Sequence, residues 1–243
     1  MQVGGVRVEL QFVADNPNLT FIFFIALVLL AVLGARFSLY AYLNRQASDL
    51  ATEGRLWDAL VAVGALAVGF ALLGVLEIVT TLRLPIKSSL VLAHVLVLAA
   101  TMRLLYRSIV PPAETGLAAY EATLTRAAVL AVAVVGVGLA LVGRHPFVIA
   151  VMGVSSVAFA AAGISFGHRG AAESRVQGTV IDTLLRHLLP VLLFGALIPG
   201  VDLATLAGLD RAVVLHVQVV FVIMTATTLM TATIKLRQTL ATL

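Results

Sequence analysis

Residues 56–108 read LWDALVAVGALAVGFALLGVLEIVTTLRLPIKSSLVLAHVLVLAATMRLLYRS, which is two long apolar runs on either side of a short turn. Each run, 57–80 and 87–108, has the length that an α-helix needs to cross a hydrocarbon core of about 30 Å. Residues 82–86 contain a proline and are typical of a tight turn. The stretch therefore predicts a transmembrane helical hairpin, and we expect the rest of the chain to pack around it.

The composition of the whole chain also indicates a membrane protein. Hydrophobic residues make up 61% and charged residues 12% of the chain, whereas a soluble domain is about half apolar and about a quarter charged. The net charge of +4 comes from Lys and Arg at the ends of apolar runs, which favours contact with lipid headgroups over nucleic acid. Cysteine is absent, so a metal or haem would need His, carboxylate or Met ligands.

Blocks of about 20 apolar residues recur along the chain and predict an all-α bundle of seven transmembrane helices. A short extracytoplasmic segment, 1–18, precedes them, and part of it alternates apolar and polar residues as a strand does. A cytoplasmic tail, 238–243, follows. The seven predicted helices form one transmembrane domain over 19–237, and they are 19–43, 56–80, 87–108, 123–143, 146–166, 179–197 and 212–234.

Charge asymmetry predicts the direction of insertion, because Lys and Arg collect on the cytoplasmic side of membrane proteins. We expect the N-terminus outside, the C-terminus in the cytoplasm, and a multi-pass protein of the cell membrane. The preference for Arg over Lys is typical of a GC-rich prokaryotic genome. The basic residues of the predicted cytoplasmic side are Arg45, Arg55, Arg107, Arg126, Arg169, Arg175, Lys235 and Arg237, against Arg7, Arg83, Lys87, Arg144 and Arg211 on the other side.

Small residues form a continuous stripe in the predicted helix 146–166, at spacings of three or four. Such a stripe lets the backbones of two membrane helices approach closely. It indicates tight packing, and it offers a face over 150–163 for a homo-oligomer or a partner membrane protein. Its members are Ala150, Gly153, Ser156, Ala160 and Gly163.

Three ionisable side chains lie at membrane depth in the outer half of the predicted bundle. At a rise of about 1.5 Å per residue, Glu77, His94 and His216 lie about 6 to 10 Å inside the outer helix ends. Such residues are costly and often functional, so one hypothesis is a transition-metal or haem site with the two histidines as ligands and Glu77 as ligand or proton acceptor. The alternative is that Glu77 pairs with Lys87 or Arg83, and that each histidine bonds to a carbonyl oxygen.

A second ionic group is predicted near the inner end of the sixth helix. Asp182 and Arg186 are four residues apart and can pair on one helix face, and His187 follows them. Arg103 and Arg36 lie at similar depth on other helices. The group is either an interfacial pair with snorkelling side chains or an anion or lipid-headgroup site built on Arg36, Arg103 and Arg186.

Two families of seven-span proteins are excluded by residues that they require. Microbial rhodopsins need a lysine midway along the last helix, but the last predicted helix has only Lys235, at its cytoplasmic end. Seven-span zinc hydrolases of the adiponectin-receptor kind need a His-x-x-x-His pair late in the chain, where this sequence has His216 alone. A nucleotide-binding Gly-x-x-x-x-Gly-Lys loop does not occur in the sequence.

The sequence contains no catalytic constellation, and its predicted loops are short. We therefore predict a non-enzymatic integral membrane protein that serves as a sensor, an accessory subunit or a scaffold. The first alternative is a haem- or metal-binding membrane redox protein that uses His94 and His216. The second is a small-solute or ion transporter, for which Glu77 and the pair of Asp182 and Arg186 are the supporting residues.

Overall fold

The computed structural model of the chain describes residues 2–3, 6–7, 12–47, 54–82, 84–109, 118–172 and 180–241. These residues are helical apart from a small N-terminal hairpin, one turn of 3-10 helix and the connections. The short elements are β1 (Gln2–Val3), β2 (Val6–Arg7), η1 (Val13–Asp15) and α7 (Leu203–Leu206). The long helices are α1 (Pro17–Ala47), α2 (Gly54–Val79), α3 (Ile86–Ile109), α4 (Ala118–Val142), α5 (Pro146–Ala172), α6 (Val180–Gly200) and α8 (Arg211–Leu240).

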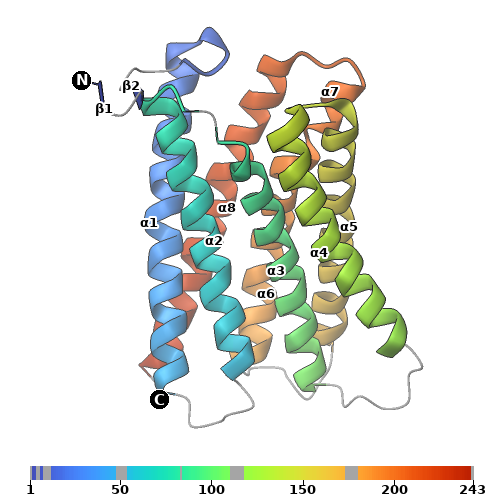
Figure 1. The fold of residues 1–243 in the computed structure, drawn as a ribbon. Coiled ribbons are helices and arrows are strands. Elements are labelled where there is room, and N and C mark those ends of the chain that lie inside the picture. The colour runs from blue at the N-terminus through green and yellow to red at the C-terminus, as the bar shows by residue number, and fades with distance from the viewer. Residues whose placement is uncertain are drawn as a thin grey trace.

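The long helices stand side by side and alternate in direction (Figure 1). We call the end of the bundle that holds η1 and α7 the upper end, and the opposite end the lower end. Among the described residues, six helices are long and apolar enough to cross a bilayer, namely α1, α2, α3, α5, α6 and α8. The described part of α4 contributes a shorter apolar stretch, Arg126–Val142. The predicted all-helical fold is therefore confirmed, with six helices of spanning length and one shorter apolar helix.

Glycines let α1 and α2 pack at close range. A Cβ atom added to Gly64 would lie 2.6 Å from the carbonyl oxygen of Gly34 and 2.9 Å from the backbone nitrogen of Ser38. The Ser38 hydroxyl also donates a 2.8 Å hydrogen bond to the carbonyl oxygen of Val61. Small residues and a hydroxyl thus join the two helices, as membrane helices commonly do.

The small-residue stripe of α5 packs against other helices of the same chain. Ser156 donates a 2.7 Å hydrogen bond to the carbonyl oxygen of Ala196 on α6. A Cβ added to Gly153 would clash with Leu203 of α7, and one added to Gly163 would lie 3.0 Å from the Cα of Ala99 on α3. The predicted close packing is present, but the chain's own helices occupy this face, so a second copy or a partner would need another surface.

Some helix ends differ from the prediction. The predicted helices ended at 166 and 234, whereas α5 continues to Ala172 and α8 to Leu240. In α5 the added turns are packed, because Gly167 and Gly170 are buried and Gly167 lies against Leu189. Tertiary packing therefore overrides the low helix propensity of glycine here.

The described N-terminal residues lie at the upper end of the bundle (Figure 1). β1 and β2 pair antiparallel, with Gln2 opposite Arg7, so the predicted strand is short and has a local partner. The N–H of Leu19 donates to the Asn16 side chain at 3.1 Å, which caps the start of α1. Predictions that concern Arg83, Arg175 and residues 8–11, 48–53, 110–117, 173–179 and 242–243 fall outside the described residues.

Candidate functional site

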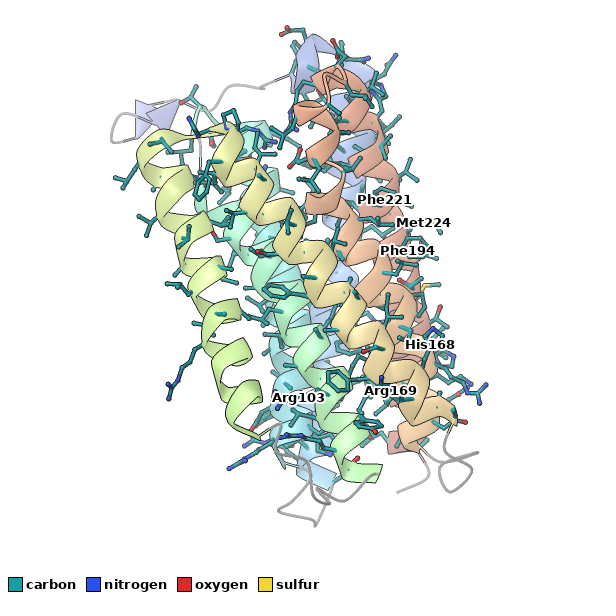
Figure 2. All side chains as sticks on the ribbon, turned by 90° about the vertical axis from the view of Figure 1, so that its right-hand side faces the viewer. Arg103, His168, Arg169, Phe194, Phe221 and Met224 are labelled. Atoms are coloured by element: carbon teal, nitrogen blue, oxygen red, sulfur yellow. The ribbon has the colours of Figure 1, made fainter. Side chains whose placement is uncertain are left out.

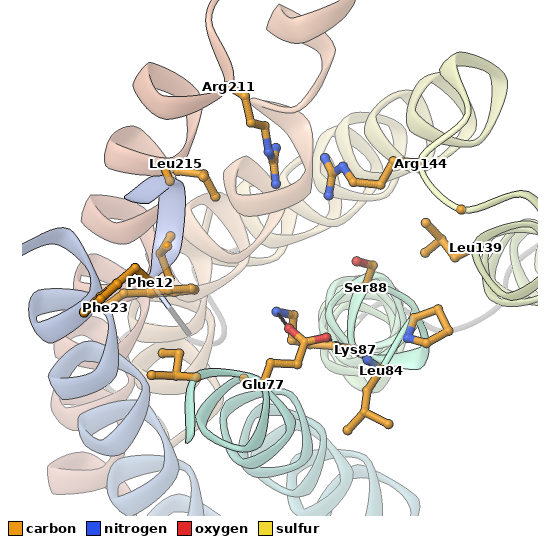
Figure 3. Close-up of a pocket in the computed structure, with 16 residues that line it drawn as sticks. Phe12, Phe23, Glu77, Leu84, Lys87, Ser88, Leu139, Arg144, Arg211 and Leu215 are labelled. Carbon is orange, nitrogen blue, oxygen red and sulfur yellow. Dashed lines mark hydrogen bonds and ion pairs between the residues drawn. The ribbon is translucent and has the colours of Figure 1, made fainter. Parts of the chain in front are cut away.

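A cavity of about 490 Å³ opens at the upper end of the bundle (Figure 3). Small-molecule sites in proteins usually have about 300–1,000 Å³. The walls of this upper cavity come from η1, α1, α2, the α2–α3 turn, α3, the end of α4 and the start of α8. Its charged lining residues are Glu77, Lys87, Arg144 and Arg211, and its apolar ones include Phe12, Phe23, Leu84, Leu139 and Leu215.

Glu77 is held by the turn that follows α2. Its Oε1 accepts a 2.9 Å hydrogen bond from the backbone N–H of Leu84, and its Oε2 forms an ion pair with Lys87 Nζ at the start of α3. The side chains of Glu77 and Lys87 are only 15% and 22% exposed, so each charge compensates the desolvation of the other. This is the pairing that the sequence offered as the alternative to a ligand role for Glu77.

Asp202 lies between α6 and α7 and joins three segments that are far apart in the sequence. Its side chain is 3% exposed, and its Oδ1 accepts hydrogen bonds from Arg144 Nη2 at 2.8 Å and Arg211 Nη1 at 2.5 Å. Arg144 lies on the α4–α5 turn, where Gly143 adopts a φ of +64° that favours glycine. Arg211 is the first residue of α8. A buried carboxylate needs such partners, because an unpaired buried charge is strongly destabilising.

The upper cavity has a surplus of positive charge. Among its described lining residues, Lys87, Arg144 and Arg211 are cationic and Glu77 is the one carboxylate. Asp202, which lines the adjoining smaller hollow, is paired with Arg144 and Arg211. The side chains of Arg144 and Arg211 are 40% and 41% exposed, and each donates a single hydrogen bond to the described residues. Figure 3 shows both guanidinium groups pointing toward the same space. Because a guanidinium carries five N–H donors that match carboxylate and phosphate oxygens, this arrangement can bind an anion.

A smaller hollow of about 80 Å³ adjoins the upper cavity and shares part of its wall. Asp202 and Gln218 line it, and the buried amide of Gln218 donates a 2.9 Å hydrogen bond to the carbonyl oxygen of Ile198. Two polar side chains of α8, Arg211 and Gln218, therefore line this hollow, about 10 Å apart along the helix axis. The residues that line both spaces are Phe23, Lys87, Ser88, Arg144, Arg211 and Leu215.

The structure does not bring Glu77, His94 and His216 together. His94 is buried on α3, and its Nδ1 lies 2.9 Å from the carbonyl oxygen of Val63 on α2. His216 is exposed on α8, with its Nδ1 2.7 Å from the carbonyl oxygen of Ala212 in its own helix. Within the described ranges, no group of three or more His, Cys, Asp or Glu side chains is placed to hold a metal ion. The metal or haem hypothesis stays a prediction without a shared geometry for these three residues.

The residues of the predicted inner group lie on three helices toward the lower end. Arg186 Nε donates to Asp182 Oδ1 at 2.6 Å, as their spacing predicts. His187 Nδ1 lies 2.7 Å from a carbonyl oxygen one turn earlier in α6. Figure 2 places Arg103 near the lower end of α3, whereas Arg36 lines a separate groove between α1 and α8. Arg36 therefore belongs to a different surface from Arg186.

The cluster of Arg144, Asp202 and Arg211 was not predicted from the sequence. All three residues fall in predicted connections on the outer side, where charged residues are ordinary. One usable signal was Asp202 itself, an acidic residue in the otherwise uncharged segment 197–208, on the side that also carries the two arginines. The contact between the α4–α5 turn and the α6–α8 connection is not encoded by any local pattern.

Comparisons of the chain with protein families, with curated proteins and with solved structures find no match.

Proposed function

We propose that this chain is a non-enzymatic, seven-span integral membrane protein that binds a small anion in the upper cavity and serves as a sensor or accessory subunit. The observation that carries the proposal is the arrangement of Arg144 and Arg211. Both side chains face one cavity, both are part-exposed, and both share one oxygen of Asp202.

The proposed orientation puts the upper end outside and the lower end in the cytoplasm of a cell. It takes α4 as the seventh span. The support is the distribution of basic residues, because Lys and Arg are enriched at cytoplasmic ends. Figure 2 shows Arg103, His168 and Arg169 near the lower end. From the element bounds, the other described basic residues toward the lower end are Arg36, Arg45, Arg55, Arg107, Arg126, Arg186, Lys235 and Arg237, against Arg7, Lys87, Arg144 and Arg211 at the upper end.

The chemistry of the cavity defines the class of ligand. The unused N–H donors of Arg144 and Arg211 suit a carboxylate or a phosphate group. Phe12, Phe23 and Leu215 form an apolar wall that suits a short hydrocarbon or aromatic part. The proposed ligand is therefore a small organic anion from the outside medium.

Binding at this place would affect the contacts between helices. A bound anion competes with Asp202 for the guanidinium groups of Arg144 and Arg211. Those contacts join the α4–α5 turn, the α6–α7 connection and α8. A ligand that changes their strength can shift the relative positions of these helices, which is the physical requirement for a sensor.

The experiment is a screen of thermal unfolding of the purified protein with inorganic phosphate, succinate, benzoate and hexanoate at constant ionic strength. We expect at least one of these anions to raise the unfolding temperature of the wild type, because a ligand that binds only the folded state stabilises it. The gain should be lost in Arg144→Gln and kept in the matched control Arg186→Gln, which removes one exposed cation at the other end. Equal behaviour of the two variants, or no stabilisation by any of the four anions, contradicts the proposal.

A transporter is the second candidate, and the smaller hollow beside the upper cavity favours it. Polar groups of Asp202 and Gln218 continue from the cavity into the bundle. Uptake of the stabilising anion into proteoliposomes separates the two candidates. Uptake that Gln218→Leu abolishes supports a transporter, and binding without uptake supports a sensor or accessory subunit.

A further inference from the structure

We propose that the groove between α1 and α8 at the lower end is a binding site for an anionic phospholipid, with Arg36 and Arg237 on its phosphate. The groove encloses about 400 Å³. Arg36, Tyr40 and Leu33 of α1 line one side, and Met230, Ile234 and Arg237 of α8 line the other. This proposal uses none of the residues of the upper cavity, and it does not depend on the function proposed for that cavity.

The charge of the groove is not compensated by the protein. No Asp or Glu is among its described lining residues. In the part of the chain that the structure describes, neither Arg36 nor Arg237 has an ion pair or a side-chain hydrogen bond. Other arginines are paired, as in Arg186 with Asp182 and Arg45 with Asp58. Two guanidinium groups that line one groove without an acidic partner therefore favour the binding of an anion from outside the protein.

The apolar part of the groove matches an acyl chain. Met230 and Ile234 are 42% and 47% exposed on the surface of α8, whereas Leu33 is buried at the floor of the groove. A soluble anion would gain nothing from these side chains. A phospholipid would place its phosphate on the arginines and its hydrocarbon chain along the apolar residues, so the groove suits both parts of one molecule.

The groove also lies at the right height for a lipid headgroup. α1 has 31 residues and is about 46 Å long at the helical rise, whereas the hydrocarbon core is about 30 Å thick. The last turns of α1 therefore extend beyond the hydrocarbon at the lower end. Arg36, which lies before those turns, can reach the interface by snorkelling.

The walls of the groove are fixed in position. Asn44 is buried, and its Nδ2 donates hydrogen bonds to the carbonyl oxygen of Tyr40 at 2.7 Å and to that of Leu236 on α8 at 3.0 Å. The bond to Leu236 holds α1 and α8 together next to the groove, and the bond to Tyr40 fixes the Asn44 side chain on α1. Because the walls of the groove are already fixed, lipid binding loses less conformational entropy in the protein.

The test is native mass spectrometry of the full chain in detergent with added phosphatidylglycerol or phosphatidylcholine. We expect the wild type to bind phosphatidylglycerol. We expect Arg36→Gln/Arg237→Gln to bind it at least about tenfold more weakly, since each interfacial arginine contributes to the binding of anionic lipid. The matched control is Arg55→Gln/Arg169→Gln, which removes the same charge from exposed positions at the same end and should bind as the wild type does. Equal loss in both double variants, or equal binding of the two lipids, overturns the proposal.

A second variant tests the acyl-chain part without removing charge. Ile234→Trp fills the groove from an exposed position, where folding should tolerate it, and we expect it to weaken phosphatidylglycerol binding as well. Unchanged binding in this variant overturns the proposed path of the hydrocarbon chain. Inorganic phosphate and glycerol phosphate distinguish the two sources of a phosphate group. If either of them displaces the lipid at equal concentration, the groove is an anion site and not a phospholipid site.

Discussion

Arg211, the first residue of α8, donates a 2.5 Å hydrogen bond to Asp202 Oδ1, nine positions earlier in the chain. Arg144 reaches the same oxygen from the α4–α5 turn. This shared carboxylate connects the α4–α5 turn, the α6–α7 connection and the start of α8, beside the upper cavity. The guanidinium groups of Arg144 and Arg211 also have N–H donors free to face that cavity. The same two arginines therefore hold helices together through Asp202 and form the proposed anion site.

The first prediction concerns the two arginines that share Asp202. Arg144→Gln or Arg211→Gln alone leaves the buried carboxylate with one cation, so each should have a modest effect on the free energy of unfolding. The double variant leaves the carboxylate buried without a cation, which costs about 3–5 kcal/mol. In a double-mutant cycle by thermal or denaturant unfolding, the double variant should therefore lose more free energy of unfolding than the two single variants lose together. Additive single effects would show that Asp202 does not depend on this pair.

The second prediction concerns the α2–α3 turn. Glu77→Ala removes the acceptor of the Leu84 N–H and the partner of Lys87, and it should lower the free energy of unfolding by about 1–3 kcal/mol. The control is Asp58→Ala, which breaks an exposed pair with Arg45 and should cost about 1 kcal/mol or less. Hydrogen exchange at the Leu84 amide should accelerate only in the Glu77 variant. An equal loss of stability in the two variants would contradict this prediction.

The third prediction concerns the contact between α1 and α2. Gly64→Ala places a Cβ atom against the backbone of Gly34 and Ser38, so the two helices must separate, at a cost of about 1–3 kcal/mol. Gly54→Ala is the matched control, because nothing lies within 4 Å of a Cβ there. Unfolding temperatures of the two variants measure the difference. Equal stability would mean that the close approach at Gly64 is absent.

The fourth prediction separates the two histidines of the metal or haem hypothesis. His94→Ala removes a buried ring that bonds to Val63 and should destabilise the protein, whereas His216→Ala removes an exposed ring and should change the unfolding temperature little. Absorption spectra of the oxidised and reduced protein, with metal analysis, provide the second readout. A Soret band or bound metal that both substitutions remove would instead support a site shared by the two residues.

The helices were predictable because hydropathy is a local property. The apolar runs of α2 and α3, the turn between them and the pair of Asp182 and Arg186 all depend on residues close together in the sequence. The small-residue stripe of α5 was also visible, but its neighbours in α3, α6 and α7 were not, because hydropathy does not determine which helices are adjacent.

The candidate site was less predictable for the same reason. Depth along each helix can be estimated from the sequence, but depth does not give the direction of a side chain. His94 and His216 are at comparable depth, and yet one is buried against α2 and the other is exposed. Similarly, the cluster around Asp202 and the groove at Arg36 each combine helices that are far apart in the sequence, so neither could be derived from spacing.

The most direct test of the central claim is a calorimetric titration of the wild type and Arg144→Gln, in lipid nanodiscs, with the anion that stabilises the protein most in the thermal screen. We expect saturable binding to the wild type that weakens as salt rises. We expect the affinity of the variant to be lower by about tenfold or more, since a charge-assisted hydrogen bond contributes about 1.5–3 kcal/mol. Equal affinity in the two proteins, or no saturable binding to the wild type, would contradict the central claim.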